Sequence, residues 1–223
     1  MPNTLFIRLD GPMQSWGIRG TWSMRDTQTA PTKSAVIGLL ACTLGARSDE
    51  TVSNLSNSLR VGVRVDRPGV MLTDYQTIGG GYAGYGHLSA DGKPKGSKGR
   101  PHVEETWKGY LADASFLVAA MSDDVDLIDS LAYHLQNPVW PPYLGRRSFP
   151  PALPLFAGVG NFNRLEDALA FPPLPSGVLD ARIIVECSPE HRGAIRVKDA
   201  VVSFRLRQFA PRYVYETTLA GGA

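Results

Sequence analysis

The sequence contains few cysteines and no long apolar run, and each shortage excludes a class of protein. Its 223 residues include only two cysteines, Cys42 and Cys187, so we expect two buried, reduced thiols in a cytoplasmic protein. No apolar stretch approaches the roughly 18 residues that a membrane-spanning helix needs. Residues 1–4 also lack the basic start of a signal peptide. We therefore expect no association with a membrane.

Metal-binding and catalytic motifs are equally scarce. The sequence contains no CxxC, no HExxH and no cluster of histidine and cysteine, so we expect neither a structural metal nor another cofactor. No Ser-His-Asp order, pair of carboxylates or nucleophile elbow stands out among the four histidines. A non-catalytic protein is the hypothesis that these absences favour.

The charge is almost balanced overall, with a formal net charge of +2, but its distribution is uneven. Between residues 86 and 103, four lysines and arginines face a single acid, Asp91. Between residues 192 and 212, six face only Asp199. Most other acids lie elsewhere, notably at 123–129. A protein with such local basic patches would bind a polyanion over a defined footprint.

A proline-rich segment at 137–153 combines features that few loops share. Its five prolines fix the backbone and remove donors, which predicts a stiff, extended loop. Trp140 and Tyr143 are costly to leave in water, and Arg146 and Arg147 supply two planar, permanently charged groups. Aromatic rings beside arginines suit phosphates and stacked bases. The alternative is a loop packed over the core with two solvated arginines.

Hydrophobic periodicity predicts a mixture of strands and helices. Leu5, Ile7 and Leu9 share one face of a first strand, and Thr32 and Gly45 would cap a buried helix between them. The segment 70–78 should pair with 60–66. We predict strands at 4–9, 60–66, 70–78, 103–110, 114–121, 182–187, 200–206 and 212–218, and helices at 33–44, 49–59, 123–136 and 164–171.

The order of these elements up to residue 136 is close to the split βαβ pattern of ferredoxin-like and RRM-type domains, which are α+β folds. A glycine-rich insertion at about 79–103 interrupts it, with eight glycines and four basic residues. An insertion of this length is normally functional or disordered. The strands after residue 151 would complete the sheet or form a small C-terminal β subdomain.

Two short segments are further candidates for binding. Lys33 and Ser34 stand at the predicted start of a helix, where free backbone N–H groups favour phosphate. The alternative is a simple helix cap with a solvated Lys33. Gln14 and Trp16 lie in a loop flanked by glycines just before it. Here the alternative is a tryptophan packed against the sheet.

Five sequence blocks, taken together and in this order, resemble one protein family. They are GPMQSWG at 11–17, PTKSAVIGLL at 31–40, DYQT at 74–77, ETWKGYLADASF at 105–116 and PYLGRRS at 142–148. They look like the CasD family, the subunit of type I-E CRISPR Cascade that binds the 5′ handle of the guide RNA (crRNA). The resemblance runs from residue 5 to about residue 215.

The resemblance implies a ferredoxin-like, RRM-type domain at 1–150, a β-hairpin thumb at about 79–103 and a β-rich extension at 151–223. It implies a non-catalytic subunit that holds the 5′ handle of crRNA and caps one end of Cascade. Its neighbours would be the repeated backbone subunit (CasC family) and the large subunit (CasA family). Because the chain lacks the aromatic RNP signatures of an RRM, we do not expect bases to stack on the sheet face.

We combine these patterns into one expected RNA-binding set. Its members are Gln14, Trp16, Lys33, Ser34, Tyr75, Thr77, Trp107, Lys108, Tyr143, Arg146 and Arg147.

Two other functions compete with this one. A metal-independent endoribonuclease that processes CRISPR repeat RNA needs a general acid and base, and His87 with Tyr85 and Lys93, or His102, could provide them. A protein–protein adaptor without RNA contact is favoured only by the small net charge.

Overall fold

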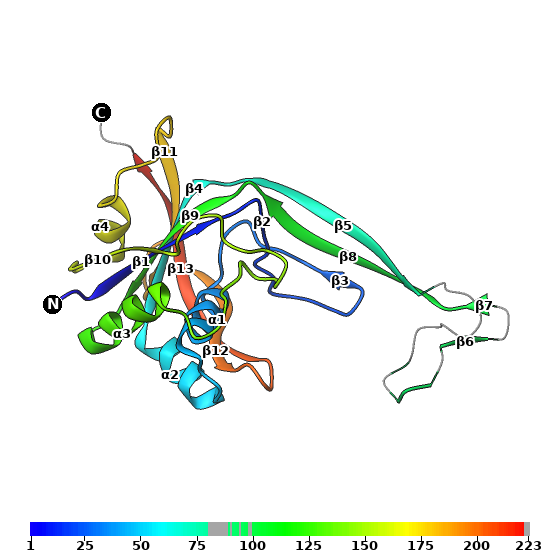
Figure 1. Ribbon diagram of the computed structural model, residues 1–223. Coiled ribbons are helices and arrows are strands. Elements are labelled where there is room, and N and C mark those ends of the chain that lie inside the picture. Colours follow the sequence, from blue (N-terminus) through cyan, green and yellow to red (C-terminus); the bar gives the residue numbers. More distant parts are fainter. Residues whose placement is uncertain (80–88, 90, 94, 98–99, 221–223) are drawn as a thin grey trace.

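The computed structural model describes residues 1–79, 89, 91–93, 95–97 and 100–220 (Figure 1). In chain order, the elements are β1 (Thr4–Asp10), β2 (Met13–Gln14), β3 (Met24–Arg25), α1 (Lys33–Leu44), α2 (Asp49–Ser58), β4 (Arg60–Arg67), β5 (Val70–Gly79), β6 (Gly96–Ser97), β7 (Arg100–Pro101), β8 (Val103–Ala112), β9 (Ser115–Met121), α3 (Val125–Gln136), β10 (Phe156–Gly160), α4 (Leu165–Ala170), β11 (Asp180–Cys187), β12 (Ile195–Ser203) and β13 (Gln208–Ala220).

A seven-stranded sheet in the order β10-β1-β9-β4-β11-β13-β12 forms the body of the molecule, and all its neighbouring strands are antiparallel. Helices α1, α2 and α3 share one hydrophobic core on one face, and α4 packs against the other face. The protein is therefore a mixed α+β fold dominated by antiparallel sheet.

Strand β1 shows how the sequence sets these two layers. Leu5, Ile7 and Leu9 are buried in the core beneath α1 to α3, whereas Phe6 joins the cluster around α4. The predicted alternation is thus confirmed, with an apolar side chain on both faces because helices cover both. Each such buried side chain contributes about 1.5–3 kcal/mol of burial free energy.

Helix α1 begins and ends at the predicted residues. The Thr32 side chain accepts a hydrogen bond from the Ala35 amide, and Gly45 adopts a left-handed conformation with φ of 69°. Only glycine fits there without strain, because an added Cβ would lie 2.7 Å from Val139. The helix is buried nearly all round, as its apolar sequence predicts, with Ile37 and Leu40 fully covered.

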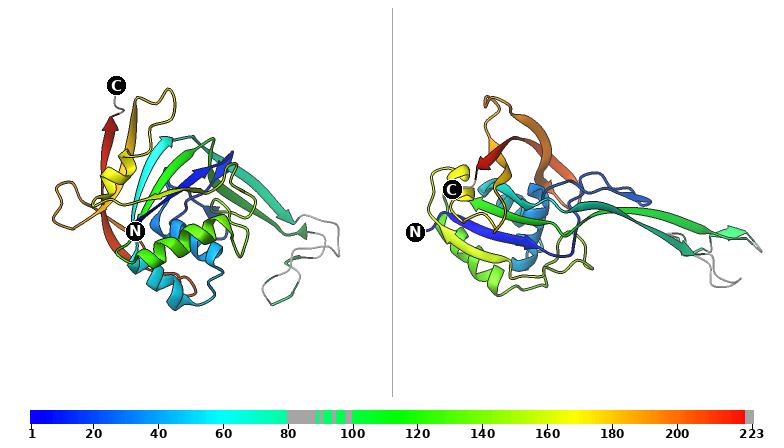
Figure 2. Two further views of the ribbon diagram at one scale, coloured as in Figure 1. Left: turned by 60° about the vertical axis from the view of Figure 1, so that its left-hand side comes forward. Right: turned by 90° about the horizontal axis from the view of Figure 1, so that it is seen from above.

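The prediction that 70–78 pairs with 60–66 is wrong. Both edges of β4 are occupied, by β9 and β11, so β5 pairs instead with β8 in an unbroken antiparallel register from Val70↔Ala112 to Gly79↔Val103. Gly69 permits this departure from the sheet, because an added Cβ would lie 2.4 Å from the Ala112 carbonyl oxygen. Figures 1 and 2 show the β5–β8 hairpin extending well beyond the body, on the side away from the start of β1. Most of the expected thumb at 79–103 lies outside the described residues.

The C-terminal strands continue the same sheet, with β11 beside β4 and then β13 and β12. Strand β12 ends at Ser203, so the predicted strand at 200–206 runs too far and includes the turn that leads to β13. Strand β10 was not predicted, because its sequence, FAGVG, contains two glycines and lacks an alternating pattern.

A buried charge network joins α1 to these strands. The Lys33 ammonium lies 3.0 Å from Glu186 on β11, while the Lys33 backbone N–H donates to Asp199 on β12. Arg212 on β13 binds Asp199 through Nε and Nη2 at 2.6 and 2.9 Å. Glu186 also accepts from the Val61 amide. Lys33 is only 4% exposed, and burial lowers its pKa against the opposing charge of Glu186.

The sequence predicted buried thiols and no membrane-spanning segment, and the structure bears on both predictions. Cys42 and Cys187 are free, and both are half-buried where full burial was expected. Burial raises the pKa of each thiol. No helix among the described residues is long and apolar enough to cross a membrane.

Prediction for the charge network. Glu186→Leu leaves the buried Lys33 ammonium without its carboxylate, so we expect a loss of about 3–5 kcal/mol in the free energy of unfolding. The double variant Lys33→Met, Glu186→Leu removes both charges and should recover most of that loss. Urea unfolding of the single and double variants measures both quantities. A loss below about 1 kcal/mol in Glu186→Leu would contradict this role for Lys33.

Candidate functional site

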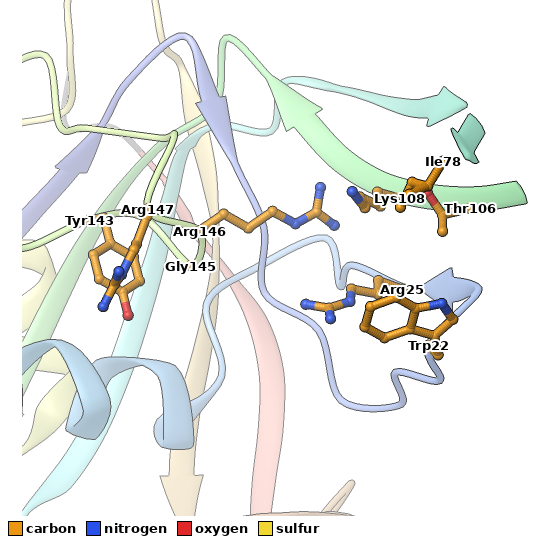
Figure 3. Close-up of a pocket in the computed structure, with 9 residues that line it drawn as sticks. All are labelled: Trp22, Arg25, Ile78, Thr106, Lys108, Tyr143, Gly145, Arg146 and Arg147. Carbon is orange, nitrogen blue, oxygen red and sulfur yellow. The ribbon is translucent and has the colours of Figure 1, made fainter. Parts of the chain in front are cut away.

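A surface pocket of about 350 Å³ lies where the proline-rich loop, the β2–β3 connection and the hairpin meet (Figure 3). Figure 3 shows the Arg146 and Arg25 guanidinium groups pointing into the same space, with Lys108 beside Arg146. The pocket is lined by Trp22, Arg25, Ile78, Thr106, Lys108, Tyr143, Gly145, Arg146 and Arg147. We call it the cationic pocket.

A tight turn in the proline-rich loop presents the two arginines. Leu144 and Phe149 are buried and anchor the turn, and the Leu144 amide donates to the Phe149 carbonyl oxygen at 2.8 Å. Between them, Gly145 adopts a φ of 90°, and an added Cβ would lie 1.8 Å from the Ser15 carbonyl oxygen. The Ser15 amide in turn donates to the Leu144 carbonyl oxygen. Only glycine can therefore occupy position 145 in this conformation.

Arg146 is held in the pocket by backbone and ring contacts. Its Nη2 donates to the Gly109 carbonyl oxygen on β8 at 2.7 Å, and its guanidinium lies 5.4 Å from the centre of the Phe149 ring. Burial lowers the pKa of Arg146, and the positive charge of Arg25 lowers it further, while Asp74 opposes both. An anion placed between the two guanidinium groups would relieve this repulsion.

The cations of this pocket differ from the buried ones. Lys33, Arg64 and Arg212 each form an ion pair with a carboxylate. Among the residues that the structure describes, no carboxylate pairs with Arg25, Lys108, Arg146 or Arg147. The Lys108 ammonium donates only to the neutral Gln76 side chain. The pocket thus concentrates positive charge that Asp74 offsets only in part.

The hairpin has a second, more apolar face. Residues alternate between the faces of a strand, so Tyr75, Thr77 and Trp107 lie on the face opposite Lys108. The Tyr75 and Trp107 rings are 5.5 Å apart, and 52% and 39% of the two residues is exposed. A hydrogen bond to Glu105 raises the pKa of Tyr75. Met24, paired with Trp107 across β3 and β8, extends this exposed face.

Comparison with known proteins identifies the family. A family model described as CRISPR-associated protein (Cas_Cas5) matches residues 4–215. The chain is 33% identical over 228 residues to the Escherichia coli (strain K12) protein named CRISPR system Cascade subunit CasD, covering 96% of both chains. It belongs to the CRISPR-associated Cas5 family.

Two solved structures resemble this Cas5 family member. One, named CRISPR RNA-guided surveillance complex, has a TM-score of 0.82 and 30% identity, with 99% of this chain and 91% of that chain covered. The other, named Crystal structure of Cas protein, has a TM-score of 0.73 and 34% identity, with 98% and 95% covered. The predicted resemblance to a Cascade subunit is confirmed.

The expected RNA-binding residues occupy four different environments. Lys108, Tyr143, Arg146 and Arg147 meet in the cationic pocket. Ser34 lines a neighbouring groove and shares a hydrogen bond of 3.1 Å with Thr32. Tyr75, Thr77 and Trp107 lie on the other face of the hairpin.

The remaining three expected residues are buried. Gln14 donates from its amide nitrogen to the Leu9 and Ala114 carbonyl oxygens, at 3.1 and 2.8 Å. Trp16 is 1% exposed and belongs to the main core. Lys33 pairs with Glu186, so it is neither a solvated helix cap nor open to an incoming phosphate. These side chains do not line the cationic pocket.

Sequence reasoning missed the contribution of β3 and of the connection that leads to it from β2. Arg25 and Trp22 line the cationic pocket from its far side. The Trp22 indole N–H donates to Glu104 at 2.6 Å, which fastens this connection to the hairpin. The signal was present as basic and aromatic residues interleaved from Arg19 to Arg25, but the segment contains only two strand residues and lacks periodicity.

The residues considered for catalysis are not gathered in this pocket. His87 and Tyr85 lie outside the described residues. Lys93 lies 3.4 Å from Asp91, and His102 Nε2 lies 3.5 Å from Glu104. The described residues that line the cationic pocket include no histidine.

Prediction for the arginine-bearing turn. Gly145→Ala adds about 1–2 kcal/mol of left-handed backbone strain and about 1–3 kcal/mol for the clash with Ser15. Gly177→Ala is the matched control, because Gly177 has a φ of 84° and nothing within 4 Å of its added Cβ. Thermal unfolding should rank Gly145→Ala as the clearly less stable variant. Equal losses would show that the contact with Ser15 does not constrain the turn.

Proposed function

We propose that this chain is the RNA-binding subunit that holds the 5′ handle of crRNA in a Cascade complex, and that it does so without cleaving the RNA. The observation that carries the proposal is the convergence of Arg25, Lys108 and Arg146 in one pocket, which Arg147 also lines, without carboxylate partners among the described residues. Guanidinium groups bind phosphate oxygens in pairs, and each contact displaces counterions from the RNA. Such contacts hold a strand in place without reading its sequence.

The named relatives support a role in Cascade. The Escherichia coli relative carries the name of a Cascade subunit, and a structural neighbour carries that of an RNA-guided surveillance complex. In RNA-guided complexes base pairing reads the target, so a subunit that holds the guide needs binding and not catalysis. A cytoplasmic location accords with this role.

We also propose a ferredoxin-like core for the Cas5 fold. Strands β1, β4, β9 and β10, with α1 after β1 and α3 after β9, follow the order strand-helix-strand-strand-helix-strand. Their order in the sheet, β10-β1-β9-β4, places the first and third strands at the centre with antiparallel neighbours. The β5–β8 hairpin enters between the second and third strands of this core, and we propose that it carries the thumb expected at about 79–103.

The two faces of the β5–β8 hairpin favour two different partners, RNA on one face and a protein subunit on the other. The face with Lys108 belongs to the cationic pocket and would contact RNA. The face with Tyr75, Trp107 and Met24 exposes large apolar groups, which favours contact with protein. We assign this apolar face to the backbone subunit of the CasC family, and the large subunit of the CasA family to another surface of the same end of the complex. Tyr75, Thr77 and Trp107 would then contact the CasC-family subunit, and they would help to hold the RNA only indirectly, through that subunit.

Prediction for RNA affinity. Arg146→Ala and Arg25→Ala should each weaken binding of handle RNA about tenfold, because each removes a charge-assisted hydrogen bond to phosphate. The slope of log affinity against log salt concentration should also fall by about 0.7 for each phosphate that is no longer neutralised. Filter binding at several salt concentrations measures both.

Arg192→Ala provides the matched control. Arg192 is exposed, carries the same charge and does not line the cationic pocket. It should change affinity little. If all three variants bind alike, the handle does not occupy this pocket.

Prediction for the competing enzyme. A metal-independent endoribonuclease would cut labelled CRISPR repeat RNA in EDTA into one discrete product, and a binding subunit would leave it intact. We expect intact RNA after incubation with the pure protein. A discrete product that disappears in His102→Ala or His87→Ala would establish the enzyme and refute the non-catalytic proposal.

A further inference from the structure

The turn between β12 and β13 faces the arginine-bearing turn across a groove that adjoins the cationic pocket. Phe204, in this turn, lines the same groove as Tyr143, Gly145 and Ser34. Phe204 and Arg207 also line a second hollow together with Arg25 and Arg146. The groove therefore begins where the cationic pocket ends, and one continuous strand could occupy both.

The turn that carries Phe204 is organised before any ligand binds. Asp49, in the first turn of α2, accepts hydrogen bonds from the Phe204 and Arg205 amides at 3.0 and 3.2 Å and from the Ser203 hydroxyl. The Ser203 hydroxyl in turn accepts from the Leu206 amide. These bonds, chiefly that from Ser203, lower the pKa of Asp49. A preorganised loop loses little conformational entropy on binding.

One wall of the groove is apolar, and two of the groove's rings are partly uncovered. Phe204 is 37% exposed and Tyr143 is 38% exposed. Gly38, in the middle of α1, lets the Phe204 ring lie close to the helix, because an added Cβ would be 3.4 Å from the ring. Leu39, Cys42 and Phe209 complete the apolar wall. A flat ring fits against this wall better than a charged group does.

We propose that this groove takes one unstacked base of the RNA strand whose phosphates occupy the cationic pocket, with Phe204 as its stacking platform and Tyr143 lining the other side. The inference rests on the proposed function, since it requires RNA in the adjoining pocket. A base fits because single-stranded RNA offers flat π faces at regular intervals along an anionic backbone. Arg207 would lie beside the phosphate next to that base, and Asp49 acts as a positioning residue.

The test uses handle RNA in which 2-aminopurine replaces one base at a time, bound to the full-length protein. We expect a change in fluorescence, typical of ring stacking, at a single position. Phe204→Ala should abolish that change and weaken binding at least about fivefold, and Phe204→Trp should retain affinity. RNA lacking the base at that one position should bind the native protein and Phe204→Ala equally.

The outcomes separate this inference from the proposed function. If Arg146→Ala weakens binding and Phe204→Ala does not, the base site is refuted and the phosphate site stands. If neither variant weakens binding, both fail. If Phe204→Ala weakens binding by the same factor for every base-deleted RNA, Phe204 does not stack on a base. If 2-aminopurine fluorescence changes at no single position with the native protein, the inference is overturned, and no variant is needed to show it.

Discussion

The contact between Gly145 and Ser15 ties the proline-rich loop to the segment that follows β1. Ser15 donates its amide to Leu144, while its carbonyl oxygen occupies the space where a side chain at position 145 would be. Because Ser15 follows directly on β2, which pairs with β8, the arginine-bearing turn is fixed relative to the hairpin. Arg146 then reaches the Gly109 carbonyl oxygen, and its guanidinium faces Arg25. This one close approach therefore sets the arginine-bearing wall of the cationic pocket.

The protein uses its cations in two ways. Lys33 and Arg212 are buried with carboxylates and join α1 to the C-terminal strands. Such pairs are costly to break and contribute little to binding, because their charge is already neutralised. Arg25 and Arg146 lie close together at the surface without such partners among the described residues. The resulting repulsion costs free energy that a bound phosphate chain would recover, which is why we assign them to RNA.

Sequence patterns predicted the elements whose signal is local. Helix α1 was predicted to the residue because Thr32, an apolar run and Gly45 act within one helix, and β1 was predicted from its alternation. The pairing of β5 was not predicted correctly, because it depends on β9 and β11 occupying the two edges of β4. These two strands lie far from β4 in the sequence.

The site residues were likewise predictable only where neighbouring positions in the sequence carry the signal. Arg146, Arg147 and Tyr143 were predicted because one short loop carries them. Lys33 was placed at a phosphate site because its partners, Glu186 and Asp199, are more than 150 residues away. The positions of Arg25 and Phe204 beside this loop could not be predicted, because only the fold brings them there. A sequence shows which charged and aromatic side chains a short segment carries. It does not show which distant residue pairs with them in the folded protein.

Photochemical crosslinking within an assembled complex tests the central claim most directly. Guide RNA carrying 4-thiouridine in its 5′ handle would be crosslinked in the complete Cascade, and the modified peptides of this chain identified by mass spectrometry. We predict adducts in peptides that contain residues 22–25 and 143–147, two segments that contribute to the lining of the cationic pocket. Efficient crosslinking to the neighbouring subunits, without an adduct in either of these segments, would contradict the account.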